Sequence, residues 1–264
     1  MTIWIALLLG LAQGITEFLP VSSSGHLVLL HNLFGVEQGT LLFTIMLHVG
    51  TLIAVIAVYY KELWDLICHP FQKKTLMLLI ALIPTVLAAV FLKDLIEESY
   101  KGHLLGFEFL LTALILWFAQ RARTGRKTIG TMRAGDALLI GVMQSISILP
   151  AVSRSGATIA GALYCKIEKK EAADFSFLLS VPAIVGSFVF EVPDLIKSGV
   201  EDVNWTFVVA GMVMAAIAGY AAVRLMLRVI TSKRLTPFIY YVATLGILVL
   251  LDQFVTNWFF ARPF

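Results

Sequence analysis

Residues 20–25 read Pro-Val-Ser-Ser-Ser-Gly and residues 150–156 read Pro-Ala-Val-Ser-Arg-Ser-Gly, and each segment interrupts an apolar stretch, 3–34 and 135–165 respectively. The flanks of these segments have only about ten to sixteen residues, which is short for a helix that crosses a bilayer. Proline removes a backbone donor, and serine and glycine favour non-helical backbone. Irregular backbone persists at membrane depth only where protein or a wet cavity surrounds it. Both stretches are therefore predicted to be re-entrant hairpins, each made of two half-helices that meet at a loop.

The composition places the chain among integral membrane proteins. Of its 264 residues 59% are apolar and only 14% charged, and the mean hydropathy is +0.90. A soluble domain has about 45–50% apolar and about 25% charged residues, so a soluble class is excluded. Besides the two hairpins, six apolar stretches are long enough to cross a bilayer. They are residues 41–60, 75–92, 104–120, 175–192, 205–227 and 237–254.

The two hairpins resemble each other. Residues 7–13 read LLLGLAQ where residues 138–144 read LLIGVMQ, and VSSSG at 21–25 corresponds to VSRSG at 152–156. Both matches have the same offset of 131 positions. Each half of the chain then contains one hairpin and three crossings, and an odd number of crossings gives the halves opposite topologies. The predicted fold is an all-α membrane domain of six transmembrane helices plus two re-entrant helical hairpins, arranged as inverted repeats over 1–125 and 132–264.

The distribution of charge agrees with this threading. One face of the membrane receives four segments that carry fifteen of the twenty Lys and Arg residues: 61–74, 121–133, 166–171 and 224–236. The other face receives 93–103, 194–204 and both termini, with only four cations among several carboxylates. Cytoplasmic loops of membrane proteins carry the excess of Lys and Arg. The basic loops are therefore predicted to be cytoplasmic, and both termini and the opening of the hairpin pocket extracytoplasmic.

Polar side chains gather in the two hairpins. A charged group at bilayer depth costs at least about 2.5–3.5 kcal/mol, so Glu17 and Arg154 each need a partner or a function. Gln13 and Glu17 are four residues apart and share one helical face. The loops offer hydroxyl groups and free N–H groups at helix N-termini, which bind anions, and the guanidinium of Arg154 fits phosphate oxygens. Because inverted repeats bring broken helices together near the midplane, these groups predict a site for phosphate-ester or phosphoanhydride chemistry.

Structural interpretations of the same residues stay open at this point. Glu17 and Arg154 could form a buried ion pair that only holds the repeats in register. His26 could make an interhelical hydrogen bond, and the serines could be packing contacts, which are common between membrane helices. His48, His69 and His103 are interpreted as structural. Separate structural explanations do not account for the clustering of all the hairpin residues in two duplicated loops.

At these residues the sequence resembles the undecaprenyl-pyrophosphate phosphatase family, also called bacitracin-resistance proteins. The family motif (E/Q)xxxE is present as Gln13-Gly-Ile-Thr-Glu17, and PGxSRSxxT as Pro150-Ala-Val-Ser-Arg-Ser-Gly-Ala-Thr158. The resemblance covers the full chain and has two departures. Position 13 is the Gln variant, which leaves one carboxylate for a metal, and Ala151 replaces a glycine, which reduces the backbone freedom expected of that loop.

The resemblance implies a hydrolase of the bacterial plasma (inner) membrane that converts undecaprenyl pyrophosphate into the monophosphate carrier lipid plus inorganic phosphate. This reaction serves peptidoglycan synthesis and cell wall biogenesis, and it is linked to bacitracin resistance. A divalent cation, Mg²⁺ or Ca²⁺, is the implied cofactor, with Glu17 and Gln13 as its ligands. The implied catalytic residues are Glu17, His26, Ser23 and Arg154. The implied substrate-binding residues are Gln13, Ser22, Ser24, Gly25, Ser153, Ser155, Gly156 and Thr158.

Two questions about mechanism and function remain open in the sequence. Ser23 could attack the phosphorus directly with His26 as its base, or His26 or Glu17 could activate a water. The competing function is a polyprenyl-phosphate flippase or anion transporter, because inverted repeats with broken helices also build transporters. The clustering of acid, base and cation favours hydrolysis. The expected partners are the polyprenyl pyrophosphate lipid and the membrane, with no nucleic acid, and a homodimer is one option for the assembly.

Overall fold

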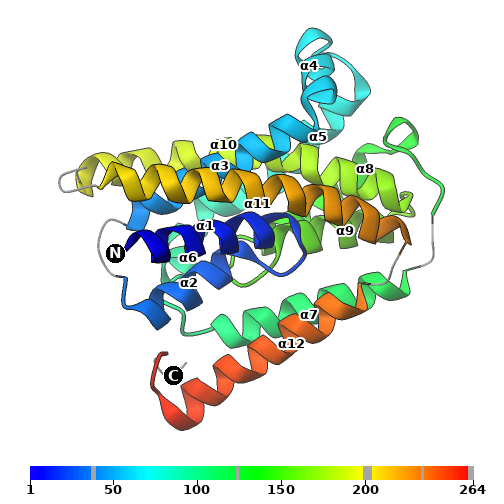
Figure 1. Ribbon diagram of the computed structural model, residues 1–264. Helices are drawn as coiled ribbons and strands as arrows, with labels where there is room; N and C mark the ends of the chain where they lie inside the picture. Colours follow the sequence, from blue (N-terminus) through cyan, green and yellow to red (C-terminus); the bar gives the residue numbers. More distant parts are fainter. Residues whose placement is uncertain (37–39, 123–124, 199–203, 233–234, 261–264) are drawn as a thin grey trace.

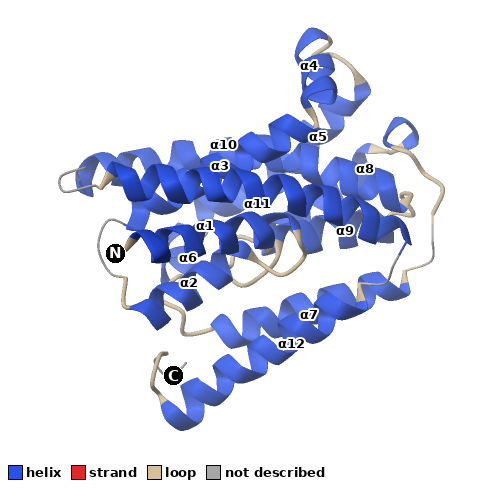
Figure 2. Cartoon of the chain, viewed as in Figure 1, coloured by secondary structure: helices blue, strands red, loops and turns tan. Residues whose placement is uncertain are grey.

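The computed structural model describes residues 1–36, 40–122, 125–198, 204–232 and 235–260, and these are helical apart from loops and turns (Figures 1 and 2). No β-strand occurs in these ranges, where the only bridge pairing is Lys127 with Ile167. The α-helices are α1 Ile3–Phe18, α2 Ser23–Phe34, α3 Thr40–Val58, α4 Tyr60–Cys68, α5 Lys73–Phe91, α6 Lys93–Ser99, α7 Leu105–Arg121, α8 Ala134–Ile146, α9 Arg154–Tyr164, α10 Lys169–Ser198, α11 Trp205–Ser232 and α12 Thr236–Leu251. A 3₁₀ turn spans Ile129–Thr131, and a π-turn at Asp252–Thr256 extends α12.

The all-α prediction is confirmed, and each of the six predicted crossings lies on a helix. Within the described ranges, five helices are long and apolar enough to cross a membrane: α3, α5, α10, α11 and α12. The sixth predicted crossing is α7, which has 17 residues and is shorter than these five. These lengths fit a multi-pass membrane protein.

Both predicted helix breaks are present. The first separates α1 from α2 at residues 19–22, and the second separates α8 from α9 at residues 147–153. Leu19 precedes a proline and has extended backbone, the conformation that proline imposes on its neighbour. In Figure 1 the helix pair α1–α2 starts and ends at the end of the bundle that carries the N-terminus, whereas α8–α9 starts and ends at the opposite end.

The first helix of each pair packs closely along one long helix from the other half of the chain. Helix α1 lies against α11, and α8 lies against α5. Gly10 and Gly141 permit this approach: a Cβ on Gly10 would lie 2.3 Å from the carbonyl oxygen of Gly211, and one on Gly141 would lie 2.3 Å from that of Ala81. These two glycines are 131 positions apart, which is the offset of the sequence repeat.

The two ends of the bundle differ in charge. Both termini lie at one end, together with the connection between α6 and α7 (Figure 1). The α7–α8 and α9–α10 connections, whose described parts contain Arg126, Lys127, Arg133 and Lys166, lie at the other end. Some charges in the count fall outside the described residues, namely Arg123, Glu201, Asp202, Lys233, Arg234 and Arg262.

Candidate active site

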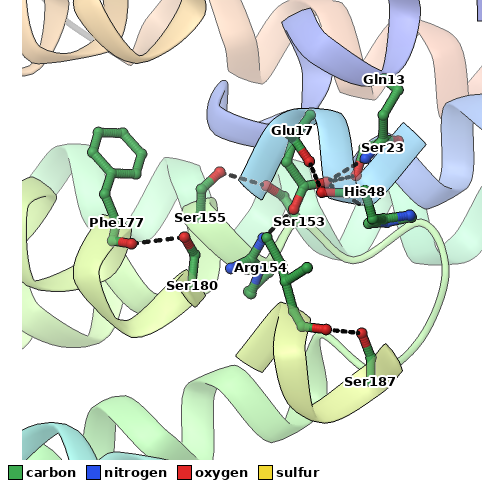
Figure 3. Close-up of polar contacts among 12 residues, drawn as sticks. Gln13, Glu17, Ser23, His48, Ser153, Arg154, Ser155, Phe177, Ser180 and Ser187 are labelled. Carbon is green, nitrogen blue, oxygen red and sulfur yellow. Dashed lines mark hydrogen bonds and ion pairs between the residues drawn. The ribbon is translucent and has the colours of Figure 1, made fainter. Parts of the chain in front are cut away.

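The two interrupted hairpins meet in an ion pair. Arg154, the first residue of α9, donates from Nη2 to Oε1 of Glu17, which lies in the last turn of α1 (Figure 3). The carboxylate side chain is 4% exposed and the guanidinium side chain 19%. The two residues are 137 positions apart in sequence, so the fold brings them together. The predicted convergence of acid and guanidinium is therefore present in the structure.

The second oxygen of Glu17 receives two further hydrogen bonds from the first hairpin. Ser23 donates its hydroxyl to Oε2, and Nε2 of Gln13 donates to the same atom over 3.0 Å. Gln13 is completely buried, and its own Oε1 has no hydrogen-bond partner among the described residues. A buried amide oxygen without a donor is uncommon in a folded protein, and this atom is therefore open to a water or a cation.

The first loop is held in a strained conformation at Ser22. This residue has φ 67°, in the left-handed region that a non-glycine residue adopts at a cost of about 1–3 kcal/mol. Three contacts offset that cost. The Oγ of Ser22 accepts from the N–H of Gly25 as the N-cap of α2 and donates to the carbonyl of Pro150 over 2.5 Å. Its carbonyl oxygen accepts from Nδ1 of His26, also over 2.5 Å.

The second loop is built in a similar way and contacts the first. Ser153 is the N-cap of α9, because its Oγ accepts from the N–H of Gly156 over 3.1 Å. Ser155 donates to the carbonyl of Leu19 over 3.1 Å and lies 3.3 Å from the Oγ of Ser153. The start of α2 and the start of α9 therefore meet near Glu17. Helix N-termini carry partial positive charge and free N–H groups, so the pair forms an anion-binding arrangement.

Gly25 and Ala151 bring the backbones of the two loops into close contact. A Cβ on Gly25 would lie 2.8 Å from the Cα of Ala151, so only glycine fits there. The sequence suggested that alanine at position 151 would limit the backbone freedom of the loop. Ala151 is not among the described residues with positive φ, so its backbone does not need the freedom of glycine, and its methyl group packs against Gly25.

His26 is not hydrogen-bonded to Ser23, the pairing considered from the sequence. Its Nδ1 donates to the Ser22 carbonyl, and its Nε2 therefore accepts from the hydroxyl of Tyr241 over 2.7 Å. The two rings stack at 5.6 Å between centroids, and Phe109 meets the imidazole edge to face. Tyr241 belongs to α12, so a helix distant in sequence fixes the orientation of the histidine.

His48 was interpreted as structural, yet it lies beside the ion pair. Its Nδ1 donates to the Thr44 carbonyl over 2.9 Å, which leaves Nε2 facing Oε2 of Glu17 at 4.0 Å. The histidine lies on α3, within an apolar span. An ionisable residue inside a membrane span is a functional candidate by default, and this rule was the signal available in the sequence.

One predicted binding residue, Thr158, points elsewhere. The hydroxyl of Thr158 contacts the Oγ of Ser176 on α10 at 2.6 Å and the carbonyl of Arg154 at 2.9 Å. These contacts join α9 to α10 and do not reach Glu17. Ser24, in the first turn of α2, is partly buried.

The oxygen atoms around Glu17 suit a hard divalent cation. No group of three or more His, Cys, Asp or Glu side chains that could hold a metal is found in the described part of the chain. Mg²⁺, however, is commonly held by one or two carboxylates together with substrate phosphates and water. The Glu17 carboxylate and the unpartnered Oε1 of Gln13 supply such a partial set. The residues therefore fit a cation that is completed by phosphate oxygens.

Comparison with known proteins shows which proteins are similar to this chain in sequence. The family model described as bacitracin resistance protein BacA matches residues 6–248. A protein named undecaprenyl-diphosphatase from Carboxydothermus hydrogenoformans is 42% identical over 251 residues, which cover 94% of this chain and 96% of the relative. Undecaprenyl-diphosphatase 4 from Bacillus thuringiensis subsp. konkukian is 44% identical over 250 residues, with the same coverage. The undecaprenyl-diphosphatase of Alkaliphilus metalliredigens is 40% identical over 272 residues, covering 95% of this chain and 98% of the relative.

Proposed function

This chain belongs to the bacitracin resistance protein BacA family, and on that basis we propose that it is an enzyme that hydrolyses undecaprenyl diphosphate to the monophosphate and inorganic phosphate. The observation that carries the proposal is the meeting of Glu17 and Arg154 between two helix N-termini. Such a site offers a carboxylate, a guanidinium, hydroxyl groups and free N–H groups to one phosphoanhydride. The names of the relatives favour hydrolysis over the transporter alternative.

Substrate binding would begin by exchanging the partner of Arg154. The guanidinium now binds Oε1 of Glu17, and a diphosphate carries more negative charge in a geometry that fits the guanidinium fork. The N–H groups at the starts of α2 and α9 would bind the remaining phosphate oxygens. When the guanidinium moves to the phosphate, Glu17 regains a free oxygen. In the substrate-free enzyme Arg154 thus pairs with Glu17, and the bound diphosphate would free the Glu17 carboxylate by taking over Arg154.

The contact between Ser23 and Glu17 supports a role for the carboxylate as proton acceptor. Ser23 Oγ would attack the terminal phosphorus while its proton passes to Glu17, and the bond to the bridging oxygen would break. Undecaprenyl phosphate leaves, and water then cleaves the serine phosphate to give inorganic phosphate. Arg154 and the helix N-termini would stabilise the charge that develops on the transferred group. If water attacks the phosphorus directly, Glu17 would accept the proton of that water instead.

A divalent cation is the proposed cofactor. Glu17 and Gln13 would hold it, and when bound it supplies Lewis-acid polarisation of the phosphate oxygens. The unpartnered Oε1 of Gln13 supports this assignment. The remaining first-loop groups keep their roles in positioning: Ser22 caps α2, and Tyr241 orients His26.

We further propose that the membrane arrangement is an inverted repeat over 1–125 and 132–264, with six crossings and two re-entrant hairpins. The opposite directions of α1–α2 and α8–α9 support it, as does the matching use of Gly10 and Gly141. The basic end of the bundle would face the cytoplasm, so that the termini and the site opening face the extracytoplasmic side. Assembly as a homodimer stays a prediction, which light scattering of the detergent-solubilised protein tests.

Phosphate release from pure protein tests the proposed function. The protein in detergent is mixed with undecaprenyl diphosphate and Mg²⁺, and inorganic phosphate is measured with and without a chelator. Release that the chelator stops and excess Mg²⁺ restores is the expected result. Binding of the lipid without release of phosphate would instead favour transport and overturn the enzymatic assignment.

A further inference from the structure

A second buried carboxylate lies outside the group described above. Glu108 is on α7 and only 4% exposed, and Thr112, one helical turn further along, is 1% exposed. The four-residue spacing places both side chains on the same face of the helix. A carboxylate at this depth persists only when its oxygens are hydrogen-bonded, so the partners of Glu108 indicate what it does.

Three of the four hydrogen bonds of these two side chains are made with backbone groups of the second loop. Oε2 of Glu108 accepts from the N–H of Ala151 over 2.9 Å, and its Oε1 accepts from the hydroxyl of Ser99 over 3.1 Å. The Oγ1 of Thr112 donates to the carbonyl of Ala151 over 2.8 Å and accepts from the N–H of Ser153 over 3.0 Å. Three backbone groups of the loop are therefore held by two side chains of α7.

The backbone groups held by these bonds lie directly before Arg154 in the sequence. Ser153 is the N-cap of α9, and Arg154 is its first residue. The position of the guanidinium consequently depends on where α7 holds the backbone at 151 and 153. The neighbouring Phe109 also contacts the first hairpin, because its ring meets His26 edge to face at 5.5 Å. Helix α7 is thus the common support of both loops.

We propose that Glu108 and Thr112 are positioning residues for the hydrolysis: they fix the backbone of the second loop so that Arg154 meets the first loop in its productive orientation. This inference rests on the proposed function. Neither side chain reaches the reacting atoms. A loop displaced by about 1 Å can lower a reaction rate by about 100-fold, so loss of these bonds acts on turnover through Arg154.

Four variants, compared in two matched pairs, test the proposal. Glu108→Ala and Thr112→Val remove the bonding atoms, and both are expected to lower kcat by about 10- to 100-fold per folded protein, with a smaller change in KM. Glu108→Gln and Thr112→Ser keep an acceptor and a hydroxyl, and each is expected to retain at least about one third of wild-type kcat, since the required bonds can re-form. Wild-type kcat in Glu108→Ala overturns the proposal, and so does a Glu108→Gln variant as impaired as Glu108→Ala.

Hydrogen exchange separates this proposal from the proposed function. In Glu108→Ala, peptides covering residues 147–158 are expected to exchange at least about tenfold faster, because the Ala151 N–H loses its acceptor. Peptides from α3 and α11 serve as the control and should keep their wild-type exchange. Exchange that is unchanged in the loop, or faster throughout the protein, overturns the positioning role. An inactive wild-type protein with the expected loop exchange would overturn the proposed function alone.

Discussion

Removing the Arg154 guanidinium should lower both the stability and the turnover of this protein, and a second substitution at Glu17 should restore only the stability. In Arg154→Met the long side chain is kept, but Glu17 loses the partner of its Oε1 and remains a buried charge. Breaking a buried ion pair from one side costs about 3–5 kcal/mol. Because Arg154 is 19% exposed and water can reach the site, we expect the lower end, about 3 kcal/mol. Turnover should fall by about 10³-fold or more, as expected for loss of an arginine that stabilises a phosphoryl transition state.

A second substitution in the same protein sharpens this prediction. Glu17→Gln in the Arg154→Met background removes the orphaned charge while keeping shape and hydrogen bonds. The double variant should therefore recover to within about 1 kcal/mol of wild type, because a buried pair replaced by neutral groups is often neutral in stability. Its turnover should stay at least about 10³-fold below that of wild type. Unfolding is followed by tryptophan fluorescence in detergent, and activity by phosphate release, on the same preparations.

The opposite pattern would refute the reasoning. If the double variant were no more stable than Arg154→Met, Glu17 would not be a buried charge that depends on Arg154. If Arg154→Met kept near wild-type turnover, the guanidinium would not bind the reacting phosphate. The first result would refute the stabilising role of the ion pair, and the second would leave it as a structural contact between the two hairpins.

Three further changes test individual groups. Ser23→Ala should lower kcat by at least about 10³-fold if the hydroxyl is the nucleophile, and a variant that keeps most of its rate assigns the attack to water activated by Glu17. Gln13→Glu adds a second carboxylate, so the Mg²⁺ concentration for half-maximal phosphate release should fall by about tenfold, and an unchanged value would remove position 13 from the metal site. Gly25→Ala places a Cβ 2.8 Å from the opposite loop, so the free energy of unfolding should fall by about 1–3 kcal/mol, measured by thermal unfolding against Gly135→Ala, where a Cβ meets no atom within 4 Å.

The sequence predicted the helices and the two breaks because the signals for them are local. Apolar length indicates a crossing, and a proline with serines and glycine indicates a break wherever it falls. The meeting of Glu17 with Arg154 could also be predicted, since duplicated loops in opposite orientations approach each other near the middle of an inverted repeat.

The supporting residues could not be predicted in the same way. Tyr241, His48 and Glu108 each lie on an apolar helix, and which face of that helix meets the loops depends on packing between distant segments. The hydrogen bond from Tyr241 to His26 spans 215 positions, and no local pattern links the two. The orientation of His26 toward α12, away from Ser23, follows from that contact. An ionisable residue in an apolar span marks a candidate, but its partner is visible only in the fold.

The contact between Gly25 and Ala151 limits which halves of homologous chains can be joined into a folded hybrid. The gap between these two backbones accommodates a single methyl group, which this chain places at position 151. A hybrid that joins the first half of one homologue to the second half of another inherits the two positions from different parents. Two alanines would force the loops apart, whereas the glycine of the family motif at position 151 leaves room for either residue at position 25, so a hybrid should fail only when both positions carry a side chain.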